Sequence, residues 1–146
     1  RVERAIEFYK DFFTDFDADR ARNMLESLHV DLSMRIKELS KGNREKVQLV
    51  MVMSRRAKLY LLDEPIGGVD PATRDYILKT IITNYEPQST VVISTHLIAD
   101  VEQALDRVIF IDHGRIVLQS DTDLIRAEKG MSVDALFREV FKCSEN

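Results

Sequence analysis

The stretch Leu59-Tyr60-Leu61-Leu62-Asp63-Glu64-Pro65 constrains this chain more than any other. Four apolar residues in a row are typical of a strand that is buried on both faces, and the proline ends that strand. The strand would deliver Asp63 and Glu64 at its C-terminal end, where open α/β sheets hold their ligands. The simpler interpretation is a buried strand that runs into an acidic surface turn. The neighbouring segments are needed to distinguish a ligand site from such a turn.

A second buried strand is predicted over 89–94, because the centre of this segment is apolar and β-branched. It delivers His96 to the same edge of the sheet, although a histidine there can also be a plain neighbour of a helix cap. Between the two strands, Gly67 and Gly68 indicate a flexible loop. Asp70-Pro71 then predicts the start of a helix that runs to about Tyr85.

Two amphipathic helices are predicted before the first strand. The first runs from Arg1 to about Thr14, and Asp17 caps the second. The apolar positions of the first helix fall at helical spacing and are expected to form one face; they are Ala5, Ile6, Phe8, Tyr9, Phe12 and Phe13. Since the chain has no initiator methionine and opens at a helix, we expect further residues before Arg1.

A polar turn, Leu39-Ser40-Lys41-Gly42-Asn43, precedes a helix whose continuation over 47–53 is apolar at nearly every position. That continuation predicts a helix buried almost all round. A serine, a glycine and free backbone N–H groups at a helix start are suited to bind an anion, which the helix dipole also favours. The plainer alternative is an ordinary serine-capped helix.

The remaining segments complete an alternating pattern. A helix is predicted from Leu97 to about Leu105, followed by a hairpin around an exposed His113-Gly114 turn. Asp121 and Ser132 are candidate caps of two closing helices. Strand and helix alternate over 59–118, which predicts a mostly parallel sheet with crossover helices and an antiparallel hairpin at its edge.

Composition restricts the classes of protein that fit. Of the 146 residues, 45% are hydrophobic and 32% are charged, as in ordinary globular domains. The net charge of −4 argues against a nucleic-acid partner. The one cysteine, Cys143, offers no disulfide framework and is interpreted as incidental, so a reducing cytoplasmic compartment is expected. No apolar run approaches the roughly 18 residues that a membrane span needs, so direct membrane insertion is not expected.

Taken in order, these motifs resemble the C-terminal portion of an ATP-binding cassette (ABC) ATPase. Residues 39–43 resemble the signature motif, 59–64 the Walker B strand, 67–70 the D-loop, and His96 the switch histidine. The resemblance implies an α/β fold, namely a partial P-loop NTPase fold of the ABC type. It divides the chain into a helical subdomain (1–38), the signature helix with the rear part of the ATPase core (39–120), and C-terminal helices (121–146).

The resemblance also implies a role for each residue. Asp63 would hold Mg²⁺ through water, Glu64 would polarise the water that attacks ATP, and His96 would contact the γ-phosphate. Two subunits would form a head-to-tail dimer that shares two ATP molecules. The residues that would bind the ATP held by the opposite subunit, or couple the two sites, are Ser40, Lys41, Gly42, Asn43 and Asp70.

Two departures from the family pattern matter. Lys41 stands where the signature usually has a second glycine, and it can either attract the phosphate or point to solvent. The phosphate-cradling loop G-x-x-x-x-G-K-[ST] is absent, because no glycine in this chain is followed by lysine. We therefore expect that this polypeptide alone neither binds ATP tightly nor hydrolyses it.

The expected function is that of the energy-coupling subunit of a membrane transporter, an exporter by the lysine in its signature. Its partners would be a transmembrane permease and a second nucleotide-binding subunit, at the inner face of the cell membrane. One alternative is the rear lobe of a DNA-repair or chromosome-organising ATPase, but such chains carry a long coiled coil where 1–38 predicts two short helices. Another is a regulatory or translation-factor protein of the ABC type.

Overall fold

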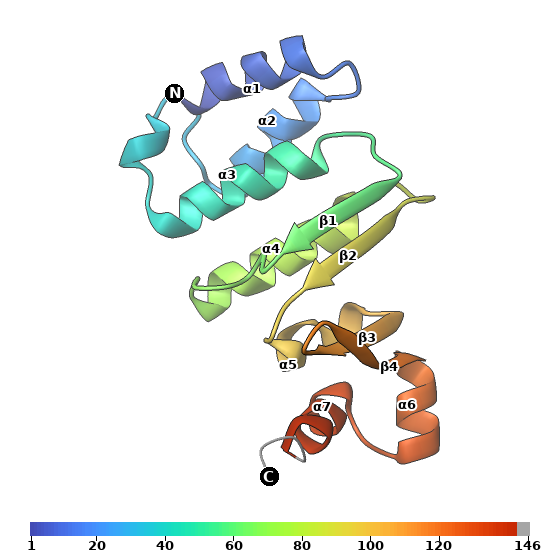
Figure 1. The fold of residues 1–146 in the computed structure, drawn as a ribbon. Helices are drawn as coiled ribbons and strands as arrows, with labels where there is room; N and C mark the ends of the chain where they lie inside the picture. Colours follow the sequence, from blue (N-terminus) through green and yellow to red (C-terminus); the bar gives the residue numbers. More distant parts are fainter. Residues whose placement is uncertain (143–146) are drawn as a thin grey trace. The chain divides into compact units, whose positions relative to one another are not determined.

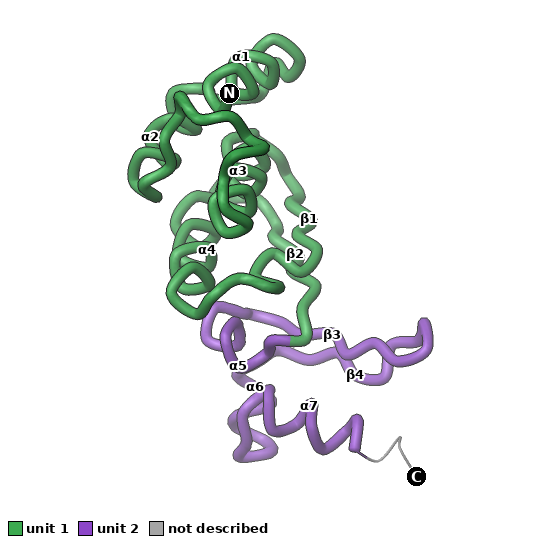
Figure 2. The backbone as a smooth tube through the Cα atoms, turned by 90° about the vertical axis from the view of Figure 1, so that its left-hand side faces the viewer, with its two compact units in different colours: residues 1–96 green, residues 97–146 purple. Residues whose placement is uncertain are grey.

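A computed structural model describes residues 1–142 of the chain. The chain divides into two compact units, Arg1–His96 and Leu97–Asn146, which are described separately (Figure 2). Cys143, interpreted above as incidental, lies outside the described residues. Within residues 1–142, no helix is both long enough and apolar enough to cross a lipid bilayer.

The first unit opens with a group of helices (Figure 1): α1 (Val2–Phe12), α2 (Ala18–Ser27), a short 3₁₀ turn η1 (Ile36–Glu38) and α3 (Lys41–Met53). The predicted cap of α2 is confirmed, because the Asp17 carboxylate accepts a hydrogen bond from the Arg20 N–H at 2.9 Å. Ile6 of α1, Leu25 of α2 and Val50 of α3 are fully buried.

The predicted apolar face of α1 is wrong in part. Phe8 and Phe12 stack on each other with ring centroids 5.7 Å apart, yet they are 61% and 70% exposed. Val2 and Ile6 form the buried stripe of this helix, and the two phenylalanines lie about 120° further round it. The apolar positions therefore cover a wider arc than the neighbouring helices can bury.

The helix α3 is buried nearly all round after its first turn, as predicted. Val47, Leu49, Val50, Met51 and Met53 are all buried, whereas Val52 is 39% exposed. This helix lies between the α1–α2 pair and the α4 helix, so it needs apolar side chains in several directions (Figure 2).

A parallel pair of strands carries the two acids. β1 (Leu59–Asp63) and β2 (Thr90–Ser94) are joined by the crossover helix α4 (Pro71–Asn84), in register from Leu59 opposite Thr90 to Asp63 opposite Ser94. The predicted burial of β1 on both faces is wrong. Tyr60 and Leu62 are buried, but Leu59 and Leu61 are 51% and 68% exposed.

The reason is that α4 covers one face of this two-stranded sheet (Figures 1 and 2). Successive side chains of a strand point to opposite faces, so every second residue of β1 lies on the face away from α4. The same alternation leaves Val92 of β2 47% exposed, so the predicted burial of the 89–94 strand is also only partly correct.

The second unit contains α5 (Ile98–Val101), the 3₁₀ turn η2 (Glu102–Ala104), β3 (Arg107–Asp112), β4 (Arg115–Asp121), α6 (Thr122–Lys129) and α7 (Val133–Lys142). Its core joins the hairpin to the helices through Ile98, Val108, Phe110, Ile125, Val133 and Leu136. The rings of Phe110 and Phe137 pack nearly perpendicular to each other, with centroids 5.4 Å apart.

Two expectations for this unit need correction. The predicted helix from Leu97 to Leu105 is one α-helical turn that tightens into a 3₁₀ turn, a common way for a short helix to end. The hairpin does not extend the parallel sheet; in the described chain β3 and β4 pair with each other as a separate two-stranded sheet. Two expectations are confirmed, the exposed turn at His113 and the cap of α7, where Ser132 Oγ accepts from the Ala135 N–H at 3.0 Å.

Candidate functional site

Asp63 and Glu64 lie where the sequence predicts them, at the C-terminal end of β1. Asp63 is the last residue of the strand. Glu64 follows it with a φ of 46°, in the left-handed region that residues other than glycine seldom adopt. This reversal turns the chain out of the sheet and presents the Glu64 side chain, 42% exposed, beyond the strand end.

The turn after Glu64 is tightly packed. The Gly67 N–H donates to the Glu64 carbonyl at 3.0 Å, which closes the turn. A Cβ at Gly67 would lie only 3.3 Å from that carbonyl oxygen, so a larger residue would require the turn to shift by a few tenths of an ångström. Ile66 and Val69 are buried and anchor the loop on both sides of the glycines. The loop is therefore held in place and does not hang freely from the strand.

The two strands bring His96 to Glu64. The Nδ1 atom of His96 lies 2.8 Å from Oε1 of Glu64, in hydrogen-bond contact. This contact follows from the parallel register, because Asp63 and Ser94 are opposite each other and Glu64 and His96 come just after them. Sequence reasoning placed both residues at one edge of the sheet, and the structure brings them together.

Ser94 is a site residue that the sequence analysis missed. Its hydroxyl donates a hydrogen bond to Oδ1 of Asp63 and accepts one from the N–H of Glu64 at 3.3 Å. Its carbonyl accepts from the same N–H at 2.9 Å. The sequence could have revealed this residue, because Ser94 is the last residue of the second strand and parallel pairing places it opposite Asp63.

The segment 39–43 begins α3, as predicted. Ser40 caps the helix, with its Oγ accepting a hydrogen bond from the Asn43 N–H at 3.2 Å. This contact is the one expected if the segment is an ordinary serine-capped helix start. Gly42 faces α4, because a Cβ at this position would lie 3.8 Å from the side chain of Thr73.

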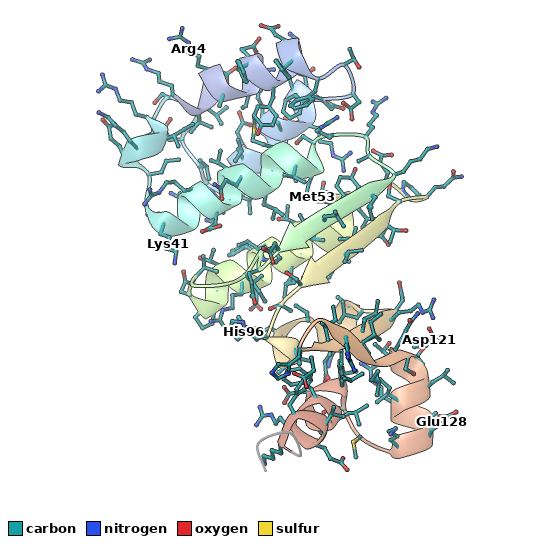
Figure 3. All side chains as sticks on the ribbon, viewed as in Figure 1. Arg4, Lys41, Met53, His96, Asp121 and Glu128 are labelled. Carbon is teal, nitrogen blue, oxygen red and sulfur yellow. The ribbon has the colours of Figure 1, made fainter. Side chains whose placement is uncertain are left out.

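Lys41 points toward its own chain. The Lys41 side chain, at the start of α3 (Figure 3), lies over Gly68, and a Cβ at Gly68 would collide with the lysine ammonium group. Gly68 also has a φ of 72°, which disfavours other residues. In the structure the Lys41 ammonium group lies against the 67–70 loop, an orientation that the sequence did not predict.

Asp70 is the cap of α4. One oxygen of its carboxylate accepts from the Thr73 N–H at 3.0 Å and the other from the Thr73 hydroxyl at 2.6 Å. The hydroxyl bond, followed by the backbone bond, lowers the pKa of Asp70 below its ordinary value because both favour the charged form. The predicted site residues thus form two groups: Asp63, Glu64 and His96 at the strand ends, and 40–43 beside 68–73.

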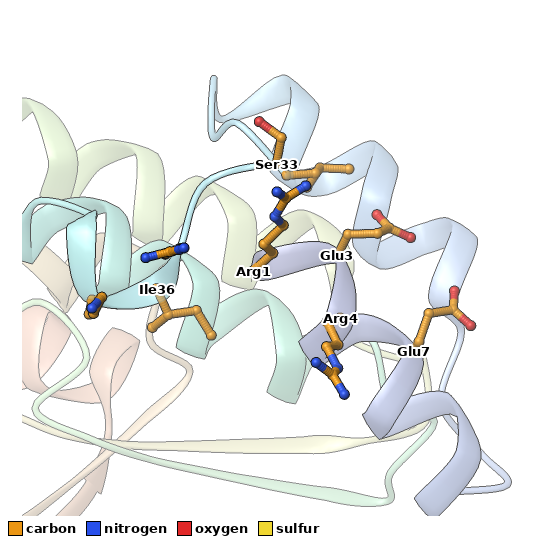
Figure 4. Close-up of a pocket in the computed structure, with 9 residues that line it drawn as sticks. Arg1, Glu3, Arg4, Glu7, Ser33 and Ile36 are labelled. Carbon is orange, nitrogen blue, oxygen red and sulfur yellow. The ribbon is translucent and has the colours of Figure 1, made fainter.

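A surface groove lies elsewhere, between the start of α1 and the segment 32–37 (Figure 4). Its labelled lining residues are Arg1, Glu3, Arg4, Glu7, Ser33 and Ile36. None of the predicted site residues lines it, so the chemistry of the two acids is exposed at the strand ends and is not enclosed by this groove.

The side chains at the strand ends suit Mg²⁺ only if waters and substrate phosphates supply the remaining ligands. Among residues 1–142, no group of three or more His, Cys, Asp or Glu side chains could hold a metal ion. Mg²⁺ nevertheless uses one or two carboxylates together with waters and substrate phosphates. Asp63 and Glu64 are both exposed, and Ser94 engages one of the Asp63 oxygens, which matches that arrangement.

Comparison with known proteins agrees with this geometry. The ABC transporter family matches residues 7–67. The ATP-binding protein YtrB of Bacillus subtilis is 24% identical over 127 residues, covering 86% of this chain and 44% of YtrB. The thiamine import ATP-binding protein ThiQ of Chelativorans sp. is 36% identical over 95 residues, covering 64% of this chain and 39% of ThiQ. The chain spans less than half the length of these curated relatives.

Solved structures show the same fold. The structure of an ATP-binding subunit of an ABC transporter aligns with a TM-score of 0.81 at 25% identity, covering 96% of this chain and 62% of that one. A dimeric bacterial ABC transporter cassette aligns with a TM-score of 0.61 at 23% identity, covering 71% and 46%. The fold is therefore that of a partial ABC-type ATPase cassette, as the sequence predicted.

Together, the family match and these relatives confirm the resemblance drawn from the motifs. The chain is a relative of the ATP-binding subunits of ABC transporters.

Proposed function

We propose that this chain is the part of an ABC transporter ATPase that carries the signature, the Walker B acids, the D-loop and the switch histidine. The observation that carries the proposal is the 2.8 Å contact between His96 and Glu64. Glu64 directly follows Asp63 at the end of β1, and His96 comes just after the neighbouring strand β2. Paired acids with a histidine at the ends of parallel strands suit the positioning of a phosphate and its attacking water. YtrB is named as an ABC transporter ATP-binding protein and ThiQ as a thiamine import ATP-binding protein, and both names support transport as the process that is powered.

Each residue receives a role in this proposal. Asp63 would hold Mg²⁺ through its water shell, and the ion would neutralise charge on the phosphates. Glu64 would accept a hydrogen bond from the attacking water and so orient it. His96, bonded to Glu64, would keep the carboxylate aimed and contact the γ-phosphate. ATP and Mg²⁺ are thus the proposed cofactors.

The second group of residues would act across a head-to-tail dimer. Ser40, Gly42, Asn43 and the α3 dipole would face the phosphate held by the opposite subunit, with Lys41 between them and the D-loop. Asp70 would stand at the dimer contact. The proposed partners are a second nucleotide-binding subunit and a transmembrane permease, at the inner face of the membrane, and the proposed direction is export.

We also propose how the 146-residue chain behaves by itself. Its strands carry the acids, but no residue sequence in the chain forms the phosphate-cradling loop. We therefore expect the 146-residue chain to hydrolyse no ATP, and we assign the parts 1–38, 39–120 and 121–146 to the helical subdomain, the core and the C-terminal helices.

A chimera tests the proposal. The P-loop-bearing part of a related cassette such as ThiQ is joined ahead of Arg1, and ATP hydrolysis is measured for the chimera and for the chain alone. The chimera is expected to hydrolyse ATP, and Glu64→Gln is expected to lower kcat by about 100-fold or more. Glu86→Gln is the matched control, because Glu86 pairs with Arg20 at the far end of α4.

Two results would contradict the proposal. One is an active chimera in which Glu64→Gln and Glu86→Gln behave alike. The other is Glu64-dependent hydrolysis by the 146-residue chain without any added part.

A further inference from the structure

The hydroxyl of Ser94 lies between the two acids and contacts both residues. It donates to Oδ1 of Asp63 and accepts from the backbone N–H of Glu64 at 3.3 Å. A serine hydroxyl has one proton to donate and lone pairs to accept, so both bonds can form at once. Ser94 is opposite Asp63 in the parallel register, which places its side chain beside the carboxylate.

The backbone at Glu64 needs this support. Its φ of 46° is unfavourable for a residue with a side chain, and such conformations persist where the surroundings hold them. The Glu64 N–H has two acceptors on Ser94, the carbonyl at 2.9 Å and the hydroxyl at 3.3 Å, and the Glu64 carbonyl accepts from Gly67. One residue of β2 therefore holds the peptide group that turns Glu64 out of the sheet.

We propose that Ser94 is a positioning residue for both acids, an inference that rests on the proposed function for its role in hydrolysis. Ser94 orients the Asp63 carboxylate and the Glu64 peptide, while His96, two residues later, holds the Glu64 carboxylate. Residues at and just after the end of β2 thus hold the two acids at the end of β1 through hydrogen bonds. Ser94 does not touch the reacting atoms; it acts through Asp63 and Glu64.

The alternative is that Ser94 is an ordinary exposed residue at a strand end, where its hydroxyl has no consequence. Thr90, at the opposite end of the same strand, is an exposed hydroxyl residue of that kind. A matched pair of substitutions separates the two views. Ser94→Thr and Ser94→Val have nearly the same shape and β propensity, and only the first keeps a hydroxyl.

The first measurement uses the 146-residue chain without ATP. The NMR signals of the Asp63 carboxyl carbon and the Glu64 amide are compared among the wild type, Ser94→Thr, Ser94→Val and Thr90→Val. We expect Ser94→Val to move both signals well beyond their line widths, Ser94→Thr to leave them near the wild type, and Thr90→Val to leave them unmoved. Equal shifts in Ser94→Thr and Ser94→Val would overturn the hydrogen-bond assignment.

The second measurement uses the hydrolysing chimera. A hydrogen bond to a charged group has a net value that corresponds to about 10- to 100-fold, so Ser94→Val is expected to lower kcat by about that factor. The KM for MgATP should change less than about twofold, since the lost bond orients acids and does not bind the nucleotide. Ser94→Thr is expected to recover most of the lost kcat.

The two proposals fail separately. If Glu64→Gln abolishes hydrolysis but Ser94→Val retains full kcat, the positioning role is wrong and the proposed function stands. If Glu64→Gln has no effect on an active chimera, the proposed function is wrong, and the NMR comparison still decides whether Ser94 holds the two acids.

Discussion

Removing the hydroxyl of Tyr60 should loosen the start of the strand that presents the acids. The Tyr60 side chain is 2% exposed, and its hydroxyl donates to the Arg55 carbonyl at 2.6 Å and accepts from the Ala57 N–H at 3.3 Å. These bonds tie the α3–β1 connection to β1. In Tyr60→Phe the ring remains, so packing is kept, but two backbone groups lose their partner.

The magnitude follows from those two groups. An unsatisfied buried polar group costs about 1–3 kcal/mol, and Arg55 and Ala57 are only half-buried, so water replaces part of the loss. We expect Tyr60→Phe to lower the free energy of unfolding by about 1–2 kcal/mol. With a urea m-value of about 1.5 kcal/mol/M, the unfolding midpoint would fall by about 1 M.

The assay is urea unfolding of the chain followed by circular dichroism. Tyr76→Phe is the matched control, because it removes the same hydroxyl from a tyrosine that lies on α4 with 52% exposure. The control is expected to unfold like the wild type. A Tyr60→Phe midpoint that also equals the wild type would refute the reasoning, since it would mean that the hydroxyl bonds make no net contribution.

Three further outcomes are expected. Arg55 hydrogen-bonds Asp15 and lowers the pKa of that carboxyl group. The wild type should therefore exceed Asp15→Asn in free energy of unfolding by the full amount above the ordinary aspartate pKa, and this difference should vanish as the pH falls through the lower pKa of the folded state. Urea titrations at several pH values measure it, and a difference that grows on acidification contradicts the prediction. Ile77→Ala, at a residue 1% exposed, should cost about 2–4 kcal/mol by thermal unfolding, whereas Ile82→Ala, 48% exposed on the same helix, should cost less than about 0.5 kcal/mol. The chain should self-associate at tens of micromolar by light scattering through the bare face of β1, and Leu61→Glu should reduce that association; a wild type that stays monomeric rules this out.

Much of the candidate site could be predicted because it depends on local order along the chain. A run of apolar residues ending in two acids predicts a strand with carboxylates at its end, and a β-branched run ending in histidine predicts its neighbour. Since parallel strands bring their C-terminal ends to one edge, Glu64 and His96 were expected together, and they are 2.8 Å apart. The caps at Asp17, Ser40 and Asp70 follow from the same kind of local chemistry.

Ser94 and Lys41 show what local order does not reveal. The contact of Ser94 with Asp63 depends on the exact register of β1 against β2, and a shift by one residue would turn the hydroxyl to the other face. The direction of Lys41 depends on the position of the 67–70 loop beside the start of α3, since the lysine ammonium group lies against Gly68. Both are long-range relations between segments that the sequence alone leaves open.

The sequence by itself determined the order of most elements, the caps at Asp17, Ser40, Asp70 and Ser132, and the family resemblance, because these depend on periodicity and on residue types at short spacing. It did not determine the cap at Asp121, which makes no side-chain hydrogen bond to its helix. The tertiary structure decided which apolar faces are buried. Leu61 and Phe12 have the same apolar chemistry as Leu62 and Ile6, yet the first two are exposed and the last two are buried. Burial depends on which neighbouring element covers each face, and that is a property of the assembled chain.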